Sequence, residues 1–144
     1  MLRTVLVTGT LVIGIVAALA QADPIGERRT LMKAVGGATR TGTQMAKGEI
    51  PFDAAKAKEI LQIYAQAADK THTFFPESSK TGGGTTAAPK IWESQADFRA
   101  RFDAWAKDIQ AAADSTNNLE AFRASFTGLT RACSGCHQAY RVQT

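Results

Sequence analysis

The stretch Cys133-Ser134-Gly135-Cys136-His137 decides how this 144-residue chain is interpreted. A C-x-x-C-H run is the attachment signature of c-type haem, in which two thiols bind the porphyrin covalently and the following histidine ligates the iron. The chain has no other cysteine. A redox disulfide would require a βαβ context, and a structural zinc site would require four ligands, of which only His72 could supply the fourth. The sequence therefore predicts one haem c, attached through Cys133 and Cys136, with His137 as an iron ligand.

The haem motif lies at the end of a strong helical pattern. Apolar side chains and both cysteines recur every three or four residues from Leu119 to Tyr140, which places them on one stripe of a helix. Asn117 is expected to cap this helix, which we place at 118–141. The haem is therefore expected inside a helical bundle and not on a loop.

Three more helices are expected. A second apolar stripe predicts a helix over 95–114, with Ser94 and Asp97 as a capping box. Capping signals predict two earlier helices: one that opens at Asp23-Pro24 and extends as far as Lys47, and one that starts at Asp53 and has Ala67 and Ala68 on its inner face. Strand signals are nearly absent, so the fold class is an all-α, antiparallel, up-down-up-down four-helix bundle with covalently bound haem.

Two features leave alternatives open. Gly36, Gly37 and Gly42 in the first helix either allow close helix contact or fray the helix. The segment from about 70 to 90 has no obvious structure, which is unusual in a compact domain. We interpret it as a long flexible connection, with a gating or partner-binding loop as the alternative.

The N-terminus predicts secretion. Arg3 precedes an apolar stretch over 5–20 that is too short to span a bilayer, so we expect residues 1–20 to be a cleavable signal peptide. An uncleaved membrane anchor is the alternative. Residues 21–144 then form one periplasmic domain. Its charge, 16 Lys and Arg against 13 Asp and Glu, and the lack of a basic stripe give no indication of nucleic-acid binding.

Three segments resemble the class II c-type cytochromes, the cytochrome c′ family. Residues 133–141 resemble the family's C-terminal signature, in which an aromatic and a basic residue follow the histidine. Pro89-Lys90-Ile91-Trp92 and Gly48-Glu49-Ile50-Pro51-Phe52-Asp53 are similar to its entries into the third and second helices. The resemblance covers essentially all of 21–144 and implies a four-helix bundle with one haem.

The resemblance raises the question of what Met32 does. It implies either a low-spin electron carrier of the cytochrome c-556 branch, with a first-helix methionine on the iron, or a high-spin protein with an open distal site that binds nitric oxide or carbon monoxide. Met32 occupies the distal position, and a thioether opposite a histidine is a known iron ligand pair. Its alternative role is to fill the core. Because Met32 is twelfth from Gln21, as in the low-spin relatives, we expect it to be a ligand. Met45 lies 13 residues further on, about 220° round the helix, so it cannot face the same iron and we expect it to be core.

The resemblance also implies roles for basic residues and partners. Arg28 lies one turn before Met32, where a relative's arginine is near a haem propionate, and Arg29 and Arg141 are further candidates, although each can equally be a solvated arginine. We expect redox partner proteins, a diatomic gas ligand in the alternative function, and a homodimer as one possible assembly. No acid, base and nucleophile converge on the pocket, so we expect the chain not to be an enzyme.

Overall fold

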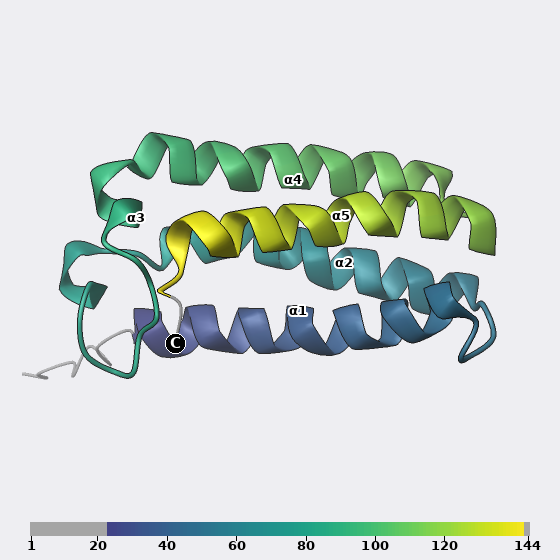
Figure 1. Ribbon diagram of the computed structural model, residues 1–144, viewed down its shortest axis with the longest axis horizontal. Helices are drawn as coiled ribbons and strands as arrows, with labels where there is room; N and C mark the ends of the chain where they lie inside the picture. The colour runs from purple at the N-terminus through teal and green to yellow at the C-terminus, as the bar shows by residue number, and fades with distance from the viewer. Residues whose placement is uncertain (1–22, 143–144) are drawn as a thin grey trace, which may run out of the picture.

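The computed structural model describes residues 23–142, so the expected signal peptide over 1–20 lies outside the described residues. Four long helices form an antiparallel bundle (Figure 1): α1 (Pro24–Lys47), α2 (Ala54–Lys70), α4 (Gln95–Ser115) and α5 (Leu119–Tyr140). Between α2 and α4 lie two 3-10 turns, η1 (Thr71–Thr73) and η2 (Glu77–Ser79), and the short α3 (Lys90–Glu93). α1 and α4 each pack against both α2 and α5. The predicted all-α four-helix bundle is confirmed.

The first two long helices begin where their capping signals predict, and α1 also ends at its predicted turn. The Asp23 carboxylate accepts a hydrogen bond from the Gly26 amide at 2.8 Å, directly before Pro24. Asp53 caps α2 in the same way through the Lys56 amide at 3.0 Å. α1 ends at Gly48, whose φ of 76° places it in the left-handed region that favours glycine.

The predicted caps of the last two helices are wrong in detail. Asn118, and not Asn117, caps α5, because its extended backbone directs its side chain at the Ala121 amide, 3.0 Å away. Ser94 stands at the N-cap of α4 but makes no capping hydrogen bond with its side chain. Asp97 does not complete a capping box, because it accepts a hydrogen bond from the Tyr140 hydroxyl of α5.

The core lies along the bundle axis and contains the predicted stripes. α5 contributes Phe122, Phe126 and Leu129, and the apolar stripe predicted over 95–114 is fully buried on α4: Phe98, Phe102, Trp105, Ile109 and Ala112. Met45 of α1 has no exposed surface, as expected for a core residue. Across residues 23–142, no helix is both long enough and apolar enough to cross a membrane.

The crossing, which we define as residues 71–89 between α2 and α3, is tied to the bundle on two sides. Arg28 of α1 donates hydrogen bonds to it from both terminal nitrogens. At its end, the Ala88 amide donates to the Tyr140 carbonyl at 2.9 Å, and the Val142 amide donates to the Thr86 carbonyl at 2.8 Å. The crossing is thus not the loose connection that we expected, because hydrogen bonds attach it to α1 and to the C-terminal end of α5.

Candidate functional site

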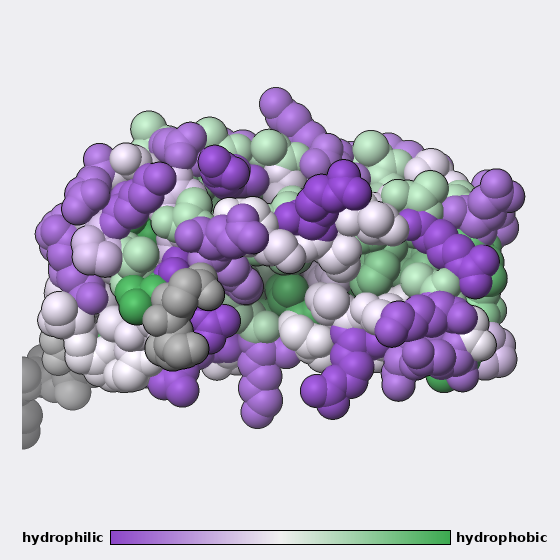
Figure 2. Space-filling view, in the orientation of Figure 1, coloured by the Kyte–Doolittle hydropathy of each residue, from purple (hydrophilic) through white to green (hydrophobic). Residues whose placement is uncertain are grey.

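A cavity of about 1250 Å³ opens between α1, α4 and α5 on the side of the bundle that the crossing covers. It exceeds the roughly 300–1000 Å³ of most small-molecule sites. Figure 2 shows this face hollowed between α1 and α5, with hydrophobic side chains at the bottom of the hollow and hydrophilic ones around it. The structure brings all six predicted site residues to this cavity: Arg28, Met32, Cys133, Cys136, His137 and Arg141.

α5 supplies one wall, which carries both cysteines. Their thiols are free and half-buried, and Cys133 Sγ lies 3.4 Å from the Leu129 carbonyl. Burial raises the pKa of both thiols, and for Cys136 the positive charge of Arg101 offsets part of the rise. Redox-active cysteines need a lowered thiol pKa. The environment therefore disfavours the redox alternative for the C-x-x-C pair.

The same wall carries His137, one turn after Cys133. Burial lowers the pKa of its imidazole, and the positive charge of Arg141 lowers it further. Both effects favour the neutral ring, which is the form that binds a metal ion. The other histidine, His72, is on η1, where its ring packs on Phe102 with centroids 5.9 Å apart, and it is not among the residues that line the cavity.

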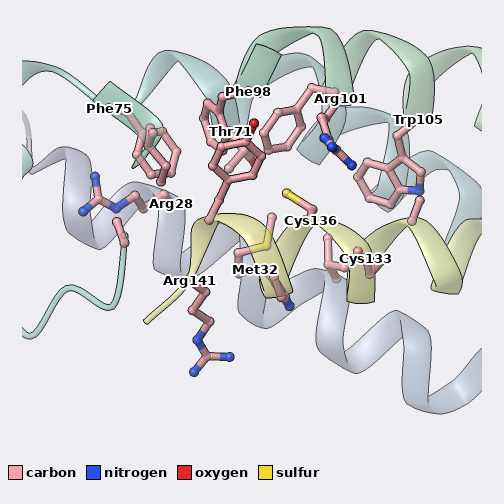
Figure 3. Close-up of a pocket in the computed structure, with 18 of the residues that line it drawn as sticks. Arg28, Met32, Thr71, Phe75, Phe98, Arg101, Trp105, Cys133, Cys136 and Arg141 are labelled. Carbon is pink, nitrogen blue, oxygen red and sulfur yellow. The ribbon is translucent and has the colours of Figure 1, made fainter. Parts of the chain in front are cut away.

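α1 supplies the facing wall, in which Met32 is half-buried. Figure 3 shows the Met32 side chain rising from α1 and that of Cys136 leaving α5, with both sulfurs directed into the same cavity. Gly36 continues this wall one turn later, and a Cβ atom built there meets no heavy atom within 4 Å. The thioether of Met32 therefore faces open space across from the helix that carries His137.

The arginines at the cavity differ in their surroundings. Arg28 is 5% exposed, and its guanidinium donates to the Phe74 and Ser79 carbonyls at 2.9 and 3.0 Å, to Ser79 Oγ at 3.0 Å and to Thr85 Oγ1 at 2.6 Å. Burial lowers its pKa, although Asp23 opposes this. Arg141 is exposed and donates from Nε to Thr86 Oγ1 at 3.3 Å. Arg28 thus organises the crossing at the cavity, whereas most of the Arg141 guanidinium is free.

Two buried polar atoms on the cavity wall have no partner. Thr71 Oγ1 and Trp105 Nε1 are the only buried side-chain nitrogen or oxygen atoms within residues 23–142 that lack a hydrogen bond. Buried polar groups are almost always paired. Large apolar walls, two thiols on one helix, a neutral imidazole and these unpaired atoms fit a large, mostly apolar group with polar edges, which is the chemistry of haem.

The sequence did not single out three of these wall residues for a role in the site. Trp105 belongs to the apolar stripe of α4, which predicts a core role for it, and Thr71 lies in the segment of 70–90 for which the sequence predicts no structure. Arg101, on α4, extends over the cavity in Figure 3 and is close enough to Cys136 to lower its pKa. Its spacing of four from the core position Trp105 was the one available signal that it shares the inner side of α4.

Comparisons with known proteins point to one family. Residues 23–141 match the family model described as Cytochrome C'. Cytochrome c' of Rhodopseudomonas palustris is 36% identical over 142 residues, which are 99% of this chain and 97% of that protein. Cytochrome c-556 of the same organism is 31% identical over 145 residues, 98% of this chain and 97% of that protein. The solved structure of cytochrome c' from Rhodopseudomonas palustris superposes with a TM-score of 0.83 at 35% identity, over 86% of this chain and 99% of that one.

Proposed function

This chain belongs to the cytochrome c′ family, and on that premise we propose that it is a periplasmic carrier of single electrons and not an enzyme. Members of the family bind one covalent haem c, and the two cysteines here suit that attachment. Cys133 and Cys136 would hold the haem, and His137 and Met32 would supply ligands to its iron. The relatives carry both the c' and the c-556 names, so the residues of the site themselves must support the choice between the branches.

One observation carries the proposal: a thioether and a neutral imidazole lie on facing helices, α1 and α5, of one cavity. Bound haem supplies a reversible one-electron change at its iron, and a methionine opposite a histidine raises the reduction potential. The chain contributes the two ligands, the apolar walls that exclude water, and the thiols that fix the position of the ring. Nothing in this arrangement needs a substrate to be turned over.

Arg28 and Arg141 are the cofactor-binding cations of the proposal. Both line the cavity, and a haem propionate is a carboxylate that a guanidinium binds well. Arg28 supplies a buried positive charge while it holds the crossing. Arg141 supplies exposed donors near the end of α5, four residues after His137.

The alternative function is a high-spin protein whose open distal site binds nitric oxide or carbon monoxide. The open space at Gly36, on the same wall as Met32, favours it, because a small ligand has room there. In this alternative Met32 is only a shield over the iron. A variant of cytochrome c prime from Alcaligenes xylosoxidans has been solved as a nitric oxide complex.

Two volume-conserving variants test the choice. Met32→Leu removes the thioether and Met45→Leu, deep in the core, removes the same atom away from the cavity. We expect ferric wild type and Met45→Leu to show the sulfur-to-iron absorption band in the far red. We expect Met32→Leu to lose this band, to become high-spin, to bind carbon monoxide rapidly and to have a lower reduction potential. Rapid carbon monoxide binding by the ferrous wild type, with no far-red band in its ferric form, would establish the gas-binding function instead.

The location is tested separately. Covalent haem attachment takes place outside the bacterial cytoplasm, and residues 1–20 read as a signal peptide. We expect the periplasmic fraction of the native host to contain a protein that begins near Gln21 and carries one haem by intact mass. A protein that retains residues 1–20 in the membrane fraction would be anchored.

A further inference from the structure

We propose that the exposed basic residues at the opening of the cavity form a docking surface for the acidic face of a redox partner protein. This inference rests on the proposed electron-carrier function and adds the kind of partner. We call these residues the basic rim and define it as Arg29 and Lys33 of α1, Arg101 of α4, and Arg131 and Arg141 next to the haem motif. All five are exposed and line the cavity.

The basic rim, together with the two carboxylates beside it, carries a charge equal to the net charge of the described chain. Residues 23–142 contain 16 Lys and Arg and 13 Asp and Glu. Of these, the five rim cations and two exposed carboxylates, Asp97 and Asp108, line the cavity opening. The remaining 11 cations, which include the buried Arg28, and 11 carboxylates cancel. The opening of the candidate haem site therefore holds a charge as large as the net charge of all the described residues.

None of the five rim cations forms an ion pair with a carboxylate of the described residues. The ion pairs within residues 23–142 are Lys47–Glu49, Lys56–Glu59 and Glu77–Lys80, and all of them lie away from the cavity opening. One of the two rim carboxylates, Asp97, already accepts the Tyr140 hydroxyl. Two ionised haem propionates would leave the site positive, because the five rim cations and Arg28 outnumber the four carboxylates.

The rim surrounds the place where an electron must enter or leave. Its residues come from three helices around one opening, so a partner that contacts them covers the mouth of the cavity. Clefts lined by one sign of charge raise the association rate of oppositely charged partners by roughly 10- to 1000-fold. Interfaces of redox partners are small and short-lived. Charge steering without tight binding is what an electron carrier needs.

An acidic protein fits this surface better than a lipid bilayer does. Val142, 48% exposed, is the only large hydrophobic side chain that is exposed within residues 23–142. A surface that inserts into a membrane presents several such side chains. The rim also encloses a hollow, visible in Figure 2, and does not form a flat basic face.

Two inorganic oxidants of opposite charge measure the local field. The ferrous holoprotein is mixed at low ionic strength with ferricyanide, a trianion, or with tris(phenanthroline)cobalt(III), a trication. Each oxidant takes one electron from the haem iron and leaves ferric protein with ferrocyanide or cobalt(II). Arg131→Glu reverses a rim charge. Arg99→Glu makes the same change at an exposed position of α4 that does not line the cavity.

We expect Arg131→Glu to slow the ferricyanide reaction roughly fivefold and to speed the cobalt reaction by a similar factor at about 10 mM ionic strength. Arg99→Glu should change either rate by less than about twofold, because it lies away from the rim. A change in reduction potential would move both rates in the same direction, so opposite directions identify the electrostatic effect.

A protein probe then tests docking itself. Reduced plant-type ferredoxin is acidic and has a low potential, so one-electron reduction of the ferric holoprotein is favourable. We expect the rate of haem reduction to saturate with ferredoxin concentration for wild type and Arg99→Glu and to lose this saturation in Arg131→Glu.

Equal behaviour of the two variants with all reagents would overturn the docking surface while leaving the electron-carrier function intact. Failure of the wild type to exchange electrons with any reagent would overturn both. Binding to phosphatidylserine vesicles that only Arg131→Glu loses, without a difference between the oxidants, would assign the rim to a membrane instead.

Discussion

Near the end of α1, a Cβ atom built on Gly42 lies 2.5 Å from Phe126 of α5, whereas one built on Gly36 meets no heavy atom within 4 Å. The same two helices therefore touch at one end of the bundle and separate at the other. At the closed end, only glycine leaves room for the Phe126 ring. At the open end, the separation leaves the cavity. The comparison shows that the site lies where α1 no longer makes the close contact with α5 that it makes at Gly42.

The two ends are also held together by different interactions. At the closed end aromatic rings pack, with centroids of Phe122 and Phe126 5.0 Å apart and those of Phe52 and Phe122 6.1 Å apart. At the open end aromatic rings also pack, with centroids of Phe75 and Phe98 4.8 Å apart, and Arg28 adds four hydrogen bonds to the crossing. We infer that the closed end depends on packing, whereas the open end depends on packing and on the polar contacts of Arg28, and four predictions test this contrast.

The largest expected effect is at the open end. Arg28→Met keeps an apolar stem but leaves the buried acceptors of the crossing without a donor, so we expect the free energy of unfolding to fall by about 3 kcal/mol. Amide exchange across 74–85 should accelerate. Arg29→Met, which loses one exposed hydrogen bond to the Gly83 carbonyl, should cost less than about 1 kcal/mol. Equal losses in urea unfolding of the two variants would show that the crossing does not depend on Arg28.

The next prediction concerns Tyr64, where the closed end begins. Burial, the largest cause, raises the pKa of the Tyr64 hydroxyl to about 12. A raised tyrosine pKa means that the folded state holds the proton more tightly than the unfolded chain does, so this stabilisation is complete below about pH 10 and is lost as the pH rises toward 12. We expect wild type to lose about 2 to 3 kcal/mol more than Tyr64→Phe over that interval. Parallel unfolding curves for the two proteins across this pH range would contradict it.

The closed end should also reject added volume. Gly42→Leu forces the Phe126 ring or the α1 backbone to move, and we expect it to lower the free energy of unfolding by about 2 kcal/mol. Gly37→Leu is the matched control, because a Cβ atom built there meets no heavy atom within 4 Å and leucine favours a helix over glycine. The control should gain up to about 1 kcal/mol. A thermal melt in which both variants lose stability would mean that α1 and α5 do not make a close contact at Gly42.

The sequence predicted the helices and the chemical residues of the site better than it predicted the connections between them. Apolar periodicity placed α4 within one residue of its observed bounds, because burial on one face repeats along the helix. Periodicity cannot show which glycine faces a ring and which faces a cavity, so the contrast between Gly42 and Gly36 needed three dimensions. The partners of Arg28 lie 46 to 57 residues away in the chain, and no local pattern predicts such contacts.

The smallest expected effect concerns Thr71, whose hydroxyl is buried without a partner on the cavity wall. Valine has nearly the same shape and no hydroxyl, so Thr71→Val should stabilise the haem-free chain by about 1 kcal/mol by removing an unpaired buried group. Thr39→Val is the control, because Thr39 Oγ1 is paired with the Val35 carbonyl at 2.8 Å and with the Tyr64 hydroxyl at 2.7 Å, and its loss should destabilise the chain by a similar amount. Both changes are measured by urea unfolding of haem-free protein.

If haem supplies the missing partner, the gain from Thr71→Val should disappear in the holoprotein, while the loss from Thr39→Val should persist. A gain that is equal with and without haem would mean that the Thr71 hydroxyl remains unpaired beside the cofactor, and the open end would then contain a polar defect unrelated to the haem.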